Sequence, residues 1–325
     1  MKYRYILTLV LFGLICTSWQ IQPKPKTIKI AVISDLNSGY GSTVYHQDVA
    51  ATLKELDSIQ PDIILCGGDM VAGQKASLTK AQLQNMWGSF DTNVLKPIQK
   101  MDIPFGFTVG NHDASPSYQE DRQTTQEFWN KKREDLGLKY IDDSHFPFYF
   151  SYQQQGVFFI SWDAAGAKVA PEVFHWMEKQ LQSKAAKKAK LRVLLGHLPL
   201  YAIVASKNKA GEVLADNENT ADFFKKNGID LYISGHQHAY YPAHQQQLRL
   251  LNAGCIGEGP RTLLGHDRPA TRAYTIIEVP VDNAKSFHYN TFIPNTGKRI
   301  ELSLLPDSVI GFNGISKKDL KAGKQ

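Results

Sequence analysis

The chain has 325 residues, 42% of them hydrophobic and 21% charged, which is the profile of a globular protein large enough to enclose a recessed site. Its formal net charge of +6 is compatible with anionic substrates. That charge falls short of the clustered basic face typical of nucleic-acid-binding proteins, so we expect no specific nucleic-acid partner. No internal repeat or long linker divides the sequence, which favours one large domain.

The first 18 residues have the pattern of a signal peptide. Two basic residues precede the apolar run from Ile6 to Cys16, and the small residues Thr17 and Ser18 follow it. The run is shorter than the roughly 20 residues that a membrane-spanning helix needs. We therefore expect an exported protein, periplasmic or extracellular, with this segment as its one membrane contact; an uncleaved segment that acts as an anchor is the alternative. Cleavage would leave two cysteines, too few for a disulfide scaffold.

Strands and helices mix along the rest of the chain, which predicts an α/β protein. Short runs that are almost entirely apolar indicate strands buried on both faces, at Ile28 to Ile33, Ile63 to Cys66, Phe105 to Val109, Leu191 to Leu195 and Leu231 to Ile233. Helical spacing predicts helices over Asp48 to Gln60, Thr79 to Lys100, Thr124 to Leu136, Pro171 to Lys187 and Asn219 to Asn227. We also predict a hairpin and two further strands, at Phe148 to Tyr152 with Val157 to Ser161, Gln247 to Leu251 and Ala273 to Val279.

Polar side chains follow each of the five buried runs, at the point where the predicted strand ends. In chain order they are Asp35 with Asn37, then Asp69, then Asn111 with His112 and Asp113, then His197, and last His236 with His238. Each alone is more often a turn residue or a helix cap. Because ligands bind beyond the carboxyl ends of strands in an open α/β sheet, the five ends can share one crevice. Together they offer the oxygen and nitrogen donors that a divalent cation takes, without the cysteines of a structural zinc site.

The chain resembles the calcineurin-like metallophosphoesterases, including the purple acid phosphatases. Four of that family's five blocks stand here in order: Gly68-Asp69, Gly110-Asn111-His112-Asp113, Gly196-His197 and Gly235-His236-Gln237-His238. The match covers about Ile28 to His238. The resemblance implies a four-layer α/β/β/α sandwich, with one catalytic domain over residues 27–305 and a C-terminal tail over 306–325.

The resemblance also implies two divalent ions, manganese, iron or zinc, with Asp69 bridging them. The other ligands would be Asp35 and His238 at the first ion and Asn111, His197 and His236 at the second. His112 would be no ligand but would act near the leaving-group oxygen, as a general acid or a stabiliser of charge, with Asp113 orienting it. Asn37 stands where the family has a histidine, and it would either bind the first ion through its amide oxygen or only hydrogen-bond a metal-bound water.

These features predict an exported phosphoesterase that hydrolyses a small phosphomonoester or phosphodiester by a hydroxide generated between two ions. The alternative is a metal-binding member of the fold with a weakened first site and no activity; the intact Gly-Asn-His-Asp block argues against it. Specificity would lie in loops over the crevice, at Gly39 to His46, Met70 to Thr79, Ala114 to Thr124 and Tyr201 to Asp216. Arg261 and Arg268 would either meet a second charged group or be ordinary surface arginines.

Overall fold

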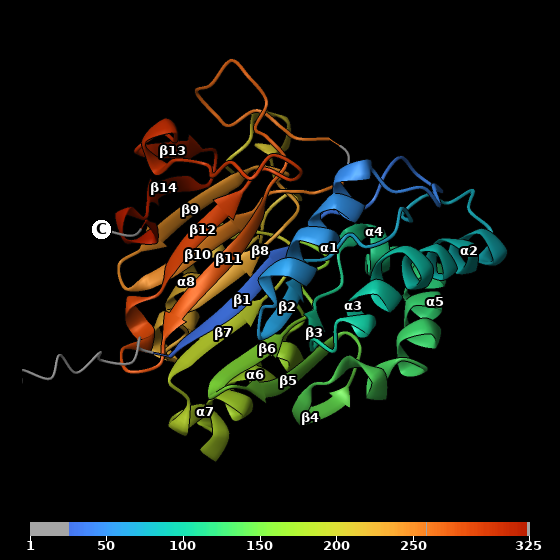
Figure 1. Ribbon diagram of the computed structural model, residues 1–325, viewed down its shortest axis with the longest axis horizontal. Coiled ribbons are helices and arrows are strands. Elements are labelled where there is room, and N and C mark those ends of the chain that lie inside the picture. The colour runs from blue at the N-terminus through green and yellow to red at the C-terminus, as the bar shows by residue number, and fades with distance from the viewer. Residues whose placement is uncertain (1–25, 258, 324–325) are drawn as a thin grey trace, which may run out of the picture.

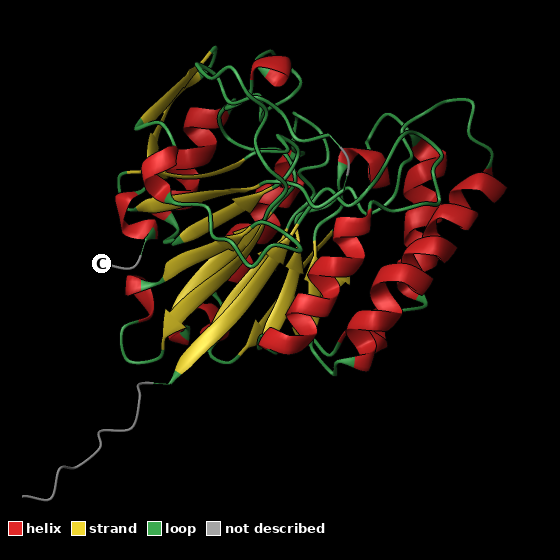
Figure 2. Cartoon of the chain, turned by 45° about the horizontal axis from the view of Figure 1, so that its top comes forward, coloured by secondary structure: helices red, strands yellow, loops and turns green. Residues whose placement is uncertain are grey.

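The computed structural model describes residues 26–257 and 259–323, so the predicted signal segment lies outside the described residues. Two β-sheets face each other, and helices cover their outer faces (Figure 1). Figure 2 shows the loops gathered at one end of the strands. Within the described ranges no helix is long and apolar enough to cross a membrane.

The smaller sheet has five strands in the order β12 (His288–Phe292), β11 (Tyr274–Pro280), β1 (Thr27–Ile33), β2 (Ile63–Cys66) and β3 (Phe105–Phe107). β1, β2 and β3 are parallel, with Ile30 opposite Ile63 and Leu65 opposite Gly106. β11 pairs antiparallel with both β1 and β12. The three parallel strands therefore end at the same edge of the sheet.

The larger sheet has nine strands, in the order β13 (Ser308–Gly311), β14 (Gly314–Lys318), β9 (Tyr240–Gln245), β10 (Leu248–Ala253), β8 (Leu231–Ser234), β7 (Leu191–Leu195), β6 (Val157–Ser161), β5 (Tyr149–Gln154) and β4 (Lys139–His145). β6, β7, β8 and β10 are parallel, and the other neighbours pair antiparallel. β5 and β6 form the predicted hairpin.

Alternate residues of the central strands β6, β7 and β8 belong to two different cores, which is why these strands are largely apolar. Val193 and Leu195 of β7 join the core that contains the smaller sheet, whereas Leu194 joins the core on the other face. Ile233 and Tyr232 of β8 divide in the same way. The predicted four-layer α/β/β/α sandwich is therefore confirmed.

Helices form the two outer layers. Those on the side of the smaller sheet are α1 (Gln47–Ile59), α2 (Lys80–Phe90), α3 (Lys96–Lys100), α4 (Asn111–Ala114) and α5 (Gln119–Asn130). Those on the side of the larger sheet are α6 (Pro171–Gln182), α7 (Lys184–Lys188) and α8 (Asn217–Lys226). A π-helical stretch, Asp91–Leu95, joins α2 to α3, and short 3₁₀ turns occupy Arg133–Leu136, Ala205–Lys207, Ala284–Ser286, Leu302–Leu304 and Leu320–Ala322.

Some predicted boundaries need correction. The helix predicted over Pro171 to Lys187 is divided at Ser183, whose extended backbone ends α6 and whose side chain caps α7 by accepting from the Ala186 N–H at 3.1 Å. The segment 306–325 is not simply a tail. Its residues 308–318 form β13 and β14, and β14 pairs with β9 at the edge of the larger sheet.

Candidate metal centre

The polar residues that follow the five buried strands meet at one place, but the strands come from both sheets. β1, β2 and β3 belong to the smaller sheet, and β7 and β8 belong to the larger sheet. The single open sheet on which we based the sequence argument is thus replaced by two facing sheets whose strand ends share a crevice. The prediction that these ends would converge still holds, because the parallel strands of both sheets end on the same side.

Asp35, Asp69 and His238 form the first group that could hold a metal ion, with their ligand atoms within 4.8 Å of one another. His238 Nε2 lies 3.1 Å from Asp35 Oδ1, while His238 Nδ1 lies 3.0 Å from the carbonyl oxygen of Gly259. The carbonyl fixes the ring so that Nε2 faces the carboxylates. The Ser34 hydroxyl donates to Asp35 Oδ2 at 2.6 Å and orients that carboxylate.

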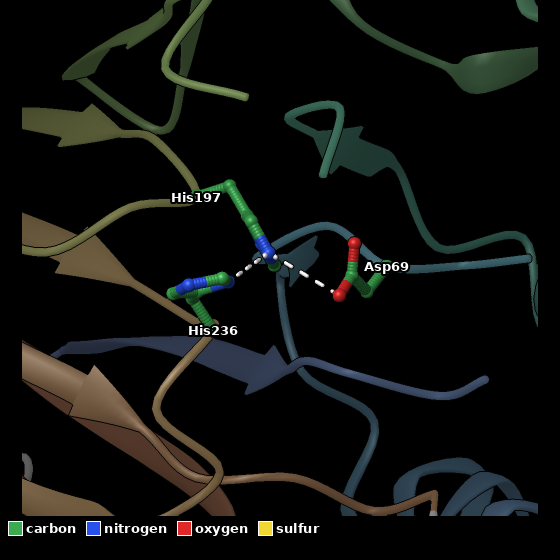
Figure 3. A group of neighbouring side chains, drawn as sticks. All are labelled: Asp69, His197 and His236. Atoms are coloured by element: carbon green, nitrogen blue, oxygen red, sulfur yellow. Dashed lines mark hydrogen bonds and ion pairs between the residues drawn. The ribbon is translucent and has the colours of Figure 1, made fainter. Parts of the chain in front are cut away.

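Asp69, His197 and His236 form the second group, again with ligand atoms within 4.8 Å of one another (Figure 3). His197 Nε2 lies 3.3 Å from Asp69 Oδ2 and 3.3 Å from His236 Nδ1. Asn111 Oδ1 lies 2.9 Å from His197 Nε2 and 2.8 Å from His236 Nδ1, so its oxygen faces the same point. His197 Nδ1 donates to the Gly67 carbonyl at 2.8 Å, which fixes the ring orientation.

Asp69 is the residue that the two groups share. Its Oδ1 accepts from the His112 backbone N–H at 2.9 Å. Its Oδ2 is buried and has no hydrogen-bond partner among the described residues, although the His197 ring lies 3.3 Å away. A buried carboxylate oxygen without a donor is costly, and a cation would satisfy it. The residues present therefore fit two metal ions with Asp69 between them.

Four of the candidate ligands share an uncommon backbone conformation. Asp35, Asp69, His236 and His238 all have positive φ, between 51° and 67°. Residues other than glycine rarely adopt this region, and each costs roughly 1–3 kcal/mol unless the surroundings impose it. Such strain clusters at functional sites. Here the positive φ turns the chain sharply after a strand and directs the ligand side chain into the crevice.

Close packing surrounds the shared carboxylate. A Cβ atom at Gly110 would lie 2.1 Å from Asp69 Oδ1, so only glycine fits at that position. Burial acts to raise the pKa of Asp69, but the nearby imidazoles of His197 and His112 hold it well below its usual range. Burial and the Lys207 ammonium lower the pKa of His236 to about 3, so that ring is neutral, as a ligand must be.

His112 lies beside the two groups and is half-buried, as expected for a residue that faces a substrate. Its Nε2 is 4.0 Å from Asp69 Oδ2, and its Nδ1 is 3.2 Å from the Gly73 carbonyl oxygen. The predicted partner, Asp113, does not contact the His112 ring. The Asp113 carboxylate accepts instead from the backbone N–H groups of Met70, Val71 and Gly110, at 2.8, 3.0 and 2.8 Å.

The role predicted for Asp113 is therefore corrected. Asp113 braces the loop after β2 against the loop after β3, and the residue that orients His112 is Gly73, through its carbonyl group. A carboxylate directly after His112 in the same block looks like a catalytic partner in sequence. Three backbone donors hold both of its oxygens, so in this structure the carboxylate fastens the two loops together.

Asn37 is buried in the loop after β1, and its backbone N–H donates to the Asp69 carbonyl at 3.1 Å. The loop therefore holds Asn37 beside the shared residue. Whether its amide oxygen binds the first ion stays a prediction.

Three residues near the second group had no place in the sequence argument beyond their loops. The Asn111 side-chain amide donates to Gln74 Oε1 at 2.6 Å, which leaves Asn111 Oδ1 free to face the histidines. Glu212 Oε2 lies 2.8 Å from His236 Nε2, and Lys207 Nζ lies 3.2 and 3.1 Å from the two ring nitrogens. No motif marks these residues. Gln74 comes from the loop after β2, and the positions of Lys207 and Glu212 depend on how the loop Tyr201 to Asp216 folds back onto His236.

A cavity of about 700 Å³ opens beside the second group, with His112, Asn111 and His236 in its wall. All four loops predicted to determine specificity contribute to it, and Tyr40 of the loop after β1 also packs against His112 with ring centroids 5.2 Å apart. Arg261 lines the cavity, whereas Arg268 is exposed and lines another hollow. Only Arg261 of the two is thus placed to meet a charged group of a substrate in this cavity.

Comparison with known proteins gives a family match and a sequence relative. A family profile described as calcineurin-like phosphoesterase matches residues 28–240. The rat serine/threonine-protein phosphatase CPPED1 is 22% identical over 238 residues, covering 68% of this chain and 69% of that protein.

Solved structures share the fold. A purple acid phosphatase, PPD1, from yellow lupin (Lupinus luteus) aligns with a TM-score of 0.63 and 14% identity over 86% of this chain, which spans about half (53%) of the lupin protein. GAP50 of Plasmodium, described as the anchor in the inner membrane complex, aligns with a TM-score of 0.54 and 13% identity, over 91% of this chain and 90% of that one.

Proposed function

Because the chain belongs to the calcineurin-like phosphoesterase family, we propose that it is a metal-dependent hydrolase of small phosphomonoesters or phosphodiesters. One observation carries this proposal: two buried groups of His and Asp side chains share Asp69, and His112 stands at their open side without being a member of either. A site that only bound metal would have no use for an imidazole whose Nε2 faces the cavity beside the shared carboxylate.

The family typically uses two metal ions, and the groups described above would hold them. Asp35, Asp69 and His238 would hold the first, and Asp69, Asn111, His197 and His236 the second. Two such ions, when bound, supply Lewis-acid activation of water and neutralise charge at phosphorus. Manganese, iron and zinc all accept these oxygen and nitrogen donors, so we propose one of them at each position.

The protein's own groups would then orient the phosphoester and handle the proton of the leaving group. The cavity exposes one flank of His112, and the Gly73 carbonyl holds its Nδ1, so Nε2 points toward the shared carboxylate and the space beside it. From that position Nε2–H would donate to the leaving-group oxygen as the ester bond breaks. Positioned general acids typically contribute about 10²–10⁴-fold to a rate.

We further propose that the enzyme works outside the cytoplasm, since the first 18 residues have the pattern of a signal peptide. A retained segment would instead anchor it to a membrane. Fractionation of cells that express the full chain, with the mature N-terminus read by mass spectrometry, would test this. An intact N-terminus in the cytosolic fraction would contradict export.

The second candidate is a metal-binding protein without activity. The Plasmodium neighbour shows that the fold also occurs in a protein described as an anchor, so the fold alone does not imply catalysis. Asn37, at the position where the family has a histidine, is the feature that favours this alternative, because it would weaken the first group.

One experiment separates the two candidates. The purified protein, stripped with a chelator and reloaded with Mn²⁺ or Zn²⁺, is assayed against phenyl phosphate, bis(4-nitrophenyl) phosphate and nucleoside monophosphates. We expect metal-dependent release of phosphate or nitrophenol that is lost again on chelation. Stoichiometric metal binding without turnover of any of these esters would favour the inactive alternative.

A further inference from the structure

We propose that Lys207 and Arg261 form a subsite for a second anionic group of the substrate. The preferred substrates would then be phosphate esters that carry another phosphate or a carboxylate. This inference rests on the proposed function, because it concerns the substrate of the same crevice. It assigns a role to two residues that belong to neither group of candidate metal ligands.

Lys207 is the buried member of the pair. It ends the 3₁₀ turn Ala205–Lys207, and only 8% of it is exposed. Its Nζ lies 3.1 Å from His236 Nε2 and 3.4 Å from Glu212 Oε2. Burying an ammonium is costly unless a countercharge compensates it. Among the described residues, the one carboxylate in contact with Lys207 is that of Glu212, and it also contacts the His236 ring at 2.8 Å. Glu212 therefore offsets the charge of Lys207 only in part.

Arg261 lies next to the candidate metal centre, since its backbone N–H donates to the His238 carbonyl at 3.2 Å. One guanidinium nitrogen, Nη1, donates to the Ser206 hydroxyl at 3.3 Å. Its Nε is buried and without a hydrogen-bond partner in the described part of the chain. Within residues 26–257 and 259–323 no carboxylate forms an ion pair with this guanidinium. An arginine in this state has a planar set of donors to offer to an oxyanion.

Charge around the cavity is strongly one-sided. Among the described residues in its wall the cations are Lys168, Lys207, Lys209 and Arg261, against the single carboxylate of Glu212. A cleft whose walls carry mostly positive charge raises the local concentration of anions. The volume of about 700 Å³ exceeds what one phosphoryl group fills and lies in the range of small-molecule sites. The remainder of the substrate therefore lies in the same cavity, within reach of the cations.

The simpler use of these cations would be to bind the transferred phosphoryl group itself. Arg261 argues against this as the whole explanation, because its side chain donates to Ser206 and forms no hydrogen bond or ion pair with His112 or Asp69, which contact each other at the reacting end of the crevice. The two roles differ in what they predict for substrates. A group that binds the reacting phosphoryl affects every ester, whereas a second-anion subsite affects only esters that carry one.

The test compares the metal-loaded enzyme on phenyl phosphate, the three carboxyphenyl phosphates and their neutral carboxamide analogues. For the wild type we expect at least one carboxylate isomer to exceed its carboxamide in kcat/KM by roughly 10- to 100-fold, the range for hydrogen bonds to charged groups. Arg261→Gln should remove this advantage and leave phenyl phosphate turnover largely unchanged. Arg268→Gln, which alters an exposed arginine outside the cavity, is the matched control.

Binding provides a readout that does not require turnover. Phosphonoacetate and methylphosphonate differ by one carboxylate, and we expect the wild type, but not Arg261→Gln or Lys207→Met, to bind phosphonoacetate more tightly. Equal affinities in the wild type would overturn the inference, as would equal losses by Arg261→Gln on all esters. Failure of the proposed function looks different, since phenyl phosphate would then not be hydrolysed at all.

Discussion

His112 differs from the other histidines of the crevice in what its ring contacts. His197, His236 and His238 each have one ring nitrogen held by a protein oxygen and the other directed at the shared cluster. His112 Nδ1 is held by the Gly73 carbonyl, but its Nε2 stays 4.0 Å from Asp69 and faces the cavity. The three other histidines thus have the geometry of metal ligands, whereas His112 has the geometry expected of a proton donor.

We expect His112→Asn to lower kcat and kcat/KM together, by about 10²–10⁴-fold, because the residue acts on the transition state and not on the metal. Metal content and thermal unfolding should match the wild type. His175→Asn, at an exposed position of α6, is the control. Loss of metal from His112→Asn would show that His112 is a ligand.

Asn37 is the residue that we predict to set the metal preference of the first group, through its amide oxygen. A neutral amide oxygen is a harder and weaker donor than imidazole, so this group is richer in oxygen than the second. We expect the first ion to be the more easily lost, and Asn37→His to bind Zn²⁺ more tightly than the wild type does. Titration of both stripped proteins with Mn²⁺ and Zn²⁺ measures this. Indistinguishable affinities would place Asn37 outside the coordination shell.

At the scale of elements, the loop from Tyr201 to Asp216 is fastened to the turn that carries His236 and His238. Gln237, between the two histidines, is fully buried. Its Oε1 accepts from the N–H groups of Ile203 and Val204 at 3.1 Å each, and its Nε2 donates to the Glu212 carbonyl at 3.2 Å. The loop therefore brings the Glu212 side chain to the outer nitrogen of His236.

Glu212→Gln should weaken the second metal position and spare the first. The carboxylate accepts from His236 Nε2, which directs Nδ1 toward Asn111 and His197. Loss of such a partner typically costs 10–100-fold in metal affinity. Glu218→Gln is the control, because that carboxylate accepts from the Tyr201 hydroxyl at 3.0 Å and not from a ligand. Equal weakening of both metal positions would contradict the assignment.

The C-terminal segment is a second element with a defined task. Residues 308–318 extend the larger sheet, and the Asp319 carboxylate pairs with the buried Arg249 of β10. Arg249 also lies over the Phe287 ring, 3.8 Å from its centroid. The segment therefore completes the sheet edge and supplies the countercharge of an arginine that would otherwise be buried without one.

Removal of that countercharge should destabilise the fold. Breaking a buried ion pair typically costs about 3–5 kcal/mol, so we expect Asp319→Ala to lower the free energy of unfolding by about that amount. Asp307→Ala removes the partner of Lys318, but the Asp307 side chain is 96% exposed, so we expect less than about 1 kcal/mol. Denaturant unfolding measures both. Equal losses would mean that burial of the Arg249–Asp319 pair contributes nothing.

For the molecule as a whole, the sequence predicted best those features that depend on local pattern. The bounds of β2 and β7 match the apolar runs, because strands buried on both faces have no polar alternation. β4, β9, β12, β13 and β14 were missed. The sequences of β9, β13 and β14 (YYPAHQ, SVIG, GISKK) include a proline, glycines and lysines, and pairing with neighbouring strands stabilises them.

In the candidate site, too, the residues that could be predicted are those marked by local sequence. Residues that end a strand, such as Asp35 and His197, could be found from their place in the sequence. Glu212, Lys207 and Gly73 could not, because their positions depend on loops that fold back from distant points of the chain. The sequence also could not show that Asp113 makes no contact with the His112 ring, because the Asp113 carboxylate accepts from backbone donors of another loop.

The central claim is that one carboxylate serves two metal positions. It is tested most directly by elemental analysis of metal bound per chain in the wild type, Asp35→Asn and Asp69→Asn. We expect two ions in the wild type, one in Asp35→Asn, and loss from both positions in Asp69→Asn, because Asp69 belongs to both groups. Equal, partial loss in the two variants would contradict the account.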